Sequence, residues 1–145
     1  PICSAASFQM GDAQLEIGPA CTSFEKRPYG LELALCQRYY QKLSSTGTSV
    51  SIGMGFADDT SSGYCLFNLP VPMRTLPTMS FSSVSDFCVR MAGGGNLTLT
   101  SLSAGGTYSP QTVFLYYQTS GLTAGRPVAL RFLTSGGYYE ASAEL

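Results

Sequence analysis

Five carboxylates beyond residue 50 are the side chains of this sequence that could do acid–base chemistry: Asp58, Asp59, Asp86, Glu140 and Glu144. Two suitably spaced carboxylates can hydrolyse a glycosidic bond, one as an acid and the other as a base or nucleophile. No motif marks two of these five as such a pair. Histidine is absent from the chain, which removes the commonest general base and the Ser-His-Asp and Cys-His arrangements. The sequence therefore predicts a protein that is not an enzyme and that uses no metal or cofactor.

Asp58 and Asp59 stand side by side in a polar run between two apolar segments. Their oxygens could accept hydrogen bonds from sugar hydroxyls or hold a hard cation such as calcium. More often such a pair makes a turn, because Asp hydrogen-bonds its own backbone. Both interpretations stay open, and the two residues are candidate ligand contacts.

Tyrosine is the other residue type suited to binding, since it offers a large ring face and a polar tip. The chain has nine Tyr and no Trp. Tyr108 and the pair Tyr138-Tyr139 lie beside glycine-containing turn segments. We expect these three either to contact a ligand or to pack in the core or at a subunit boundary.

Arg74 and the cysteines have structural interpretations. Arg74 lies between two prolines in "VPMRTLP", where its planar donor fork predicts a buried or intersubunit ion pair or a contact to carbonyls. The five cysteines are an odd number without CxxC spacing, so neither a complete disulfide framework nor a zinc site is indicated. We interpret them as free thiols of a protein made in a cytoplasm.

Composition excludes several classes of partner. Charged residues make up 12% of the 145 residues and the net charge is −1, so no basic cluster is available to neutralise nucleic acid. No apolar run approaches the ~20 residues that cross a bilayer, so membrane insertion is not expected. The start, "PICSAASFQM", resembles no signal peptide and lacks an initiating Met, which suggests a piece of a longer chain.

Beyond residue 48, apolar and polar residues alternate in short segments, as in half-buried β-strands. The segments are "SVSIGMGF", "GYCLFNL", "TMSFSSV", "DFCVRM", "NLTLTSL", "TVFLYYQT", "RPVALRFLT" and "YYEASAEL". The first places four apolar residues on one face: Val50, Ile52, Met54 and Phe56. Turn-forming clusters separate the segments, which predicts a mainly β protein, an antiparallel β-sandwich or open barrel of seven or eight strands. We favour the sandwich.

Residues 29–43, within "RPYGLELALCQRYYQKL", are predicted to form a helix before these strands. One apolar row follows the spacing of a coiled-coil seam: Leu33, Cys36, Tyr40 and Leu43. A second row at i, i+4 and i+8 contains Leu31, Leu35 and Tyr39. A helix on one β domain needs a single row, so the second indicates contact with symmetry mates. The alternative is a helix clamped between two domains of one chain.

Residues 14–43, "QLEIGPACTSFEKRPYGLELALCQRYYQKL", resemble a segment of tail-fibre and related virion proteins of tailed bacteriophages, where it opens the C-terminal domain. The match in "ELALCQRYY" (32–40) has no gap and is the specific part. Residues 69–82 are similar to the family's Pro-Val-Pro-Met-Arg strand pair, and "SAEL" to its closing strand. The chain departs from the family in having Cys-Thr-Ser at 21–23, where Ala-Thr-Pro is common.

The resemblance implies a homotrimeric fibre tip, made in a bacterial host cytoplasm and carried in the virion. It would bind host surface polysaccharide, of capsule or lipopolysaccharide, without catalysis. Residues 1–18 would be the last strand of a preceding fibre domain, 19–28 a connector, 29–43 the helix with the seam residues at the trimer interface, and 44–145 the β-sandwich tip. Two alternatives are a structural trimerisation or capping module and a polysaccharide-degrading domain.

We expect a trimer in solution, because the helix has two apolar rows and the resemblance implies three-fold fibres. Sedimentation equilibrium at micromolar concentration should give about three times the 15.4 kDa of one chain. A mass of one chain at that concentration would contradict this expectation.

Overall fold

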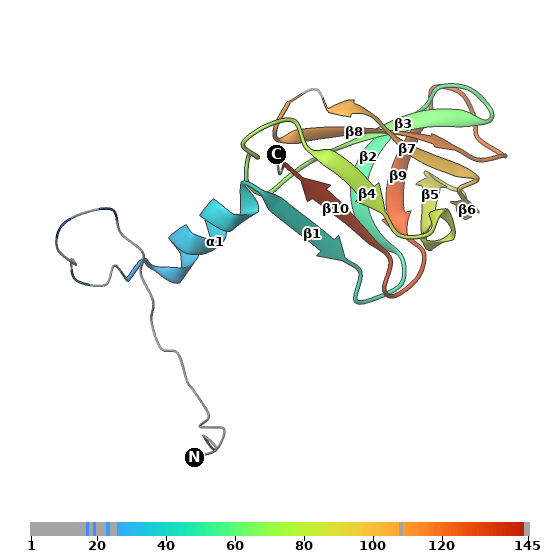
Figure 1. Cartoon of the computed structure of the whole chain (residues 1–145). Helices are drawn as coiled ribbons and strands as arrows, with labels where there is room; N and C mark the ends of the chain where they lie inside the picture. The colour runs from blue at the N-terminus through green and yellow to red at the C-terminus, as the bar shows by residue number, and fades with distance from the viewer. Residues whose placement is uncertain (1–16, 18, 20–22, 24–25, 108, 144–145) are drawn as a thin grey trace, which may run out of the picture.

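The structure is a computed structural model that describes residues 17, 19, 23, 26–107 and 109–143. One helix, α1 (Tyr29–Gln37), precedes ten strands in two antiparallel sheets (Figure 1). The expected mainly β fold with a single preceding α-helix is confirmed. Within this part of the chain, no helix is long and apolar enough to cross a membrane. The expected strand at 1–18 lies outside the described residues except for residue 17.

The larger sheet has seven strands in the order β6-β5-β9-β2-β3-β8-β7. They are β2 (Val50–Ala57), β3 (Ser62–Asn68), β5 (Phe87–Met91), β6 (Asn96–Thr98), β7 (Ser101–Thr107), β8 (Thr112–Gln118) and β9 (Pro127–Phe132). The smaller sheet has the order β1-β10-β4, with β1 (Tyr40–Ser44), β4 (Thr78–Phe81) and β10 (Tyr138–Ser142). A 3-10 turn, η1 (Val84–Asp86), leads into β5.

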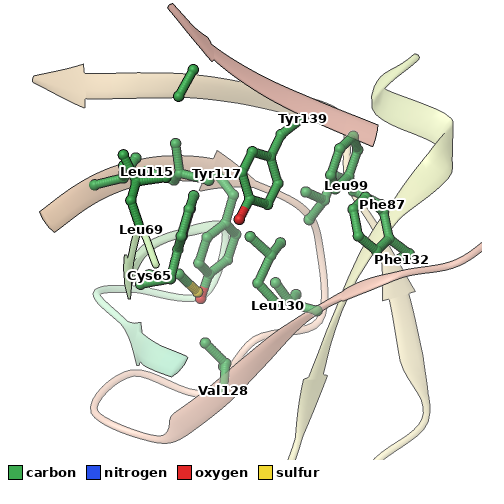
Figure 2. Packing of buried hydrophobic residues seen from close by; sticks show 14 of the residues in the cluster. Cys65, Leu69, Phe87, Leu99, Leu115, Tyr117, Val128, Leu130, Phe132 and Tyr139 are labelled. Carbon is green, nitrogen blue, oxygen red and sulfur yellow. The ribbon is translucent and has the colours of Figure 1, made fainter. Parts of the chain in front are cut away.

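The core lies where the two sheets face each other. Tyr139 of β10 points toward Leu130 and Tyr117 of the larger sheet (Figure 2), and its ring centroid lies 4.9 Å from that of Phe67 on β3. The ring of Phe81 on β4 meets the ring of Phe87 on β5 edge-on, with the ring centroids 6.0 Å apart. These aromatic contacts join the sheets, so the fold buries one face of each.

Glycines on β2 and β3 allow the backbone and Tyr117 to pack closely in this core. A Cβ at Gly63 would overlap the Tyr117 hydroxyl, and a Cβ at Gly55 would overlap the Tyr64 carbonyl oxygen. The Tyr117 hydroxyl donates a hydrogen bond to the Phe56 carbonyl oxygen at 3.2 Å. Between residues 53 and 57, the inner positions of β2 are therefore glycine and alanine, and the large side chains Met54 and Phe56 lie on the other side.

The expectation that Val50, Ile52, Met54 and Phe56 share one face is wrong. The pairing of β2 with β9 shifts register between Ser51 and Gly53, which is the sign of a bulge. Ile52 packs against the core, whereas Met54 and Phe56 are exposed on the outer face.

The helix begins at Tyr29 as expected but ends at Gln37 rather than at residue 43. Residues 40–44 instead form β1, because they pair with β10 along its whole length. Gln41 reinforces the break, since its side-chain Nε2 donates a hydrogen bond to the Gln37 carbonyl at 2.9 Å. This extra strand, together with the division of residues 96–107 into β6 and β7, gives ten strands rather than seven or eight.

Replacing Leu130, which is fully buried on the inner face, by alanine should lower the free energy of unfolding by about 2–5 kcal/mol through lost contacts and a cavity. Leu66→Ala is the matched control: Leu66 lies on the outer face and should cost less than about 1 kcal/mol. Urea unfolding measures both. Equal losses would contradict the assignment of inner and outer faces.

Candidate ligand-binding site

Asp58 and Asp59 lie in the turn between β2 and β3, where Asp59 organises the backbone. Its Oδ1 accepts hydrogen bonds from the N–H groups of Ser61 and Ser62, both at 2.6 Å, and its Oδ2 accepts one from the Ser62 hydroxyl at 2.9 Å. These bonds lower the pKa of Asp59 to about 2. The Asp59 carboxylate is thus engaged by the turn, while Asp58 is exposed. Across the described ranges, no group of three metal-ligating side chains is close enough to hold an ion.

The three tyrosine candidates do not lie together. Tyr139 is 6% exposed and belongs to the core, so its interpretation as a receptor contact is wrong and its interpretation as a packing residue is right. Tyr108 lies outside the described residues. Tyr138 is half-buried on the outer face of the smaller sheet, where Lys42 Nζ lies 3.9 Å from its ring centroid.

Polar groups around Tyr138 already bind one another. Lys42 Nζ forms an ion pair with Glu140 Oε1 at 2.8 Å, and the Ser80 hydroxyl donates to Glu140 Oε2 at 3.2 Å. The hydrogen bond with Lys42 holds the pKa of Glu140 below its ordinary value, and the same bond raises the pKa of Lys42. A ligand here would have to compete with this network.

The candidate contacts Asp58 and Tyr138 also lie far apart in the fold. Tyr138 pairs with Ser44, which precedes the first residue of β2. Asp58 directly follows the last residue of β2. The eight residues of β2 separate the two positions by roughly 25 Å. The Asp58-Asp59 turn and Tyr138 therefore do not form one site.

The four expected interface residues do not form a helical seam, because Tyr40 and Leu43 belong to β1. Leu33, Tyr40 and Leu43 nevertheless line one cavity of about 360 Å³ where α1 meets β1. Cys36 is exposed on α1. Beside this cavity, Oε1 of the buried Gln41 has no hydrogen-bond partner. The helix itself extends away from the sheets and buries none of its residues (Figure 1).

Arg74 and the cysteines complete the predicted positions. Arg74 is exposed rather than buried, and its guanidinium carbon lies 5.1 Å from the Tyr39 ring centroid. Its backbone N–H donates a hydrogen bond to the Arg38 carbonyl at 2.9 Å. The three described cysteines are free: Cys36, Cys65 and Cys88. Burial raises the pKa of the Cys65 thiol to about 12, which makes it a packing residue rather than a nucleophile.

The outer face of the seven-stranded sheet carries a surface that the sequence analysis missed. We call it the aromatic band, and it consists of Met54, Phe56, Tyr64, Leu66, Phe114 and Tyr116 from β2, β3 and β8. The register pairs these residues directly across the strands, Met54 with Leu66, Leu66 with Phe114, Phe56 with Tyr64, and Tyr64 with Tyr116. Four are exposed: Met54 at 75%, Phe56 at 49%, Tyr116 at 47% and Leu66 at 39%. Tyr64 is half-buried, and Phe114 is buried at 8% exposure.

The rings of the band hold one another in place. Tyr64 stacks on Phe114 with centroids 5.1 Å apart, and Phe114 meets Tyr116 edge-on at 4.7 Å. Gly105 of β7 gives the Tyr116 ring its space, since a Cβ there would overlap that ring. An exposed apolar surface on one face of a sheet is a candidate interaction site, and the contacts among its rings hold them in position.

Sequence did contain a signal for the band. "GYCLFNL" and "TVFLYYQT" are apolar at consecutive positions rather than alternate ones, so both faces of β3 and β8 are apolar. Only one of those faces can be buried against the smaller sheet.

Comparison with known proteins adds no family or relative. No family model matches the chain, and neither curated proteins nor solved structures include a significant match.

Asp59→Ala should lower the melting temperature at pH 7, because it removes the hydrogen bonds that shape the β2–β3 turn. A carboxylate whose pKa is lowered by folding stabilises the protein above its ordinary pKa of 3.8, and that stabilisation is lost as the pH falls toward about 2. The difference in melting temperature between the two proteins should therefore shrink over this interval. A difference that does not change with pH would contradict the assigned role.

Proposed function

We propose that this chain is a receptor-binding tip domain of a phage tail fibre, a β-sandwich that attaches to bacterial surface polysaccharide without catalysis. The observation that carries the binding role is the aromatic band. The faces of sugar rings carry C–H groups that pack on aromatic rings, while tyrosine hydroxyls can hydrogen-bond sugar hydroxyls. Tyr64 and Tyr116 provide such tips within an otherwise apolar surface.

The order of the band supports this role. Binding costs conformational entropy when flexible side chains must be fixed, and a surface already held in position avoids part of that cost. The mutual contacts of Tyr64, Phe114 and Tyr116 fix these rings in advance. Polysaccharides repeat the same unit many times, so several copies of a weak site would gain avidity.

The helix supports the fibre and the trimer in this proposal. A nine-residue helix is too short to be stable alone in water, and α1 buries none of its residues in the described part of the chain. Tyr29, Leu31 and Leu33 are among its exposed side chains. Packing against the same helix in two other copies would cover them, and residues 32–37 of the family-like motif belong to this helix.

The absence of catalysis is also part of the proposal. Three of the candidate carboxylates are hydrogen-bonded to neighbours: Asp59 to its turn, Glu140 to Lys42 and Ser80, and Asp86 to the Thr134 hydroxyl at 2.7 Å. Each lies in a different part of the fold. Glu144 is outside the described residues.

A structural trimerisation or capping module is the second candidate function. It is favoured by the exposed helix and by the cavity lined by Leu33, Tyr40 and Leu43, which a neighbouring copy could fill. Under this alternative the chain assembles but binds no glycan.

Tyr116→Ala should weaken binding to the glycans found on an array, and adsorption to the corresponding cells, about tenfold, the ratio that ~1.4 kcal/mol gives. The melting temperature should change little because half of this side chain is exposed. Tyr138→Ala, on the smaller sheet, is the matched control and should bind normally.

The possible failures lead to different conclusions. If Tyr138→Ala loses binding while Tyr116→Ala does not, the site belongs to the smaller sheet. If the trimer forms but no glycan on the array binds, the structural module is the better account.

A further inference from the structure

A cavity of about 520 Å³ opens on the outer face of the larger sheet, directly beside the aromatic band. Arg90 of β5, Ala129 of β9 and Met54 of β2 occupy one row across the strands, and all three line it. Ser51 and Arg131 line it from the next row. The hollow exists because Ala129 is much smaller than the arginine and methionine on either side of it.

Two cations face this cavity without an acidic partner. Within the described ranges, no carboxylate oxygen lies within 4.0 Å of the guanidinium of Arg90 or Arg131; the ion pairs found there are Arg27–Glu32 and Lys42–Glu140. Arg131 Nε is buried and has no hydrogen-bond acceptor. One residue of the rim, Ala92, accepts a hydrogen bond at its carbonyl from Arg126 Nη1 at 3.2 Å. A chain of net charge −1 thus places positive charge without an acidic partner at one end of the aromatic band.

We propose that this cavity binds the acid group of an acidic saccharide whose sugar ring lies on Met54 and the adjoining aromatic band. This inference rests on the proposed function and names its ligand class. A guanidinium offers two parallel N–H donors that match a carboxylate or phosphate, and these charge-assisted bonds are stronger than those to a neutral hydroxyl. Met54 lies in the row between Arg90 and Leu66. A sugar ring packed on Met54 would therefore have its acid group near Arg90 and its other end near the aromatic band.

The same charges argue against a second copy of the chain as the occupant. Covering this face with another apolar surface would bury Arg90 and Arg131 without counter-charge, which is strongly unfavourable. An acidic sugar supplies that counter-charge and leaves the rest of the face open.

Saturation-transfer NMR on the full chain tests the proposal with three probes: glucose, glucuronic acid and glucose 6-phosphate. We expect both acidic sugars to bind at least tenfold more tightly than glucose, and this preference to weaken as NaCl is raised. The ratio of the dissociation constants of glucuronic acid and glucose 6-phosphate tells whether a carboxylate or a phosphate fits better. Arg90→Gln, at an exposed position, should remove most of the preference for acids and leave the weak glucose signal unchanged. Arg90→Lys should retain part of it, and Arg74→Gln, which lies outside the cavity, should retain all of it.

The outcomes separate this inference from the proposed function. Equal, salt-independent binding of glucose and glucuronic acid would overturn the acid pocket while leaving a neutral-glycan tip intact. An acid preference that survives Arg90→Gln would also overturn it. Acid binding that depends on Arg90, in a protein that adsorbs to no cell, would support the pocket and overturn the role in host attachment alone.

Discussion

The ring of Tyr117 lies against the inner face of β2 and β3, and much of the structure depends on that contact. Gly63 must lack a side chain for the ring to fit, and the hydroxyl is satisfied by the Phe56 carbonyl. Burial raises the pKa of this hydroxyl, so it stays a neutral donor. Because the second half of β2 approaches β3 so closely, its inner positions there are glycine and alanine: Gly53, Gly55 and Ala57.

This constraint determines what the outer face can be. The large side chains of β2, Met54 and Phe56, lie on the side away from the smaller sheet. There they meet the outward rings of β3 and β8, which the cross-strand register places opposite them. The same strand therefore closes the core with its small residues and builds the exposed band with its large ones. Ala129 continues the row and leaves the hollow between Met54 and Arg90.

Sequence reasoning predicted the strands well, because period-two alternation and glycine-rich turns are local signals. It extended the helix too far, since the pairing of residues 40–44 with β10 joins segments almost a hundred residues apart. It left Tyr139 open between a ligand contact and a packing residue, because turn proximity says nothing about which face a strand residue occupies. It missed the aromatic band for a related reason: strands that are apolar on both faces indicate a buried sheet, and sequence does not show that the second sheet covers only one side. The band's connection to Arg90 and Arg131 depends on strand order, which no local pattern contains.

The central claim is that the outer face of the larger sheet is open in the assembled protein and becomes covered when ligand binds. Limited peroxide oxidation of the native protein, read by mass spectrometry, measures this at methionine sulfur. Met54, 75% exposed, should oxidise quickly, whereas Met73, 4% exposed, should be protected; host polysaccharide should then slow the oxidation of Met54 and leave that of Met73 unchanged. A Met54 that is as protected as Met73 before any polysaccharide is added would show that another chain covers this face, and would contradict the account.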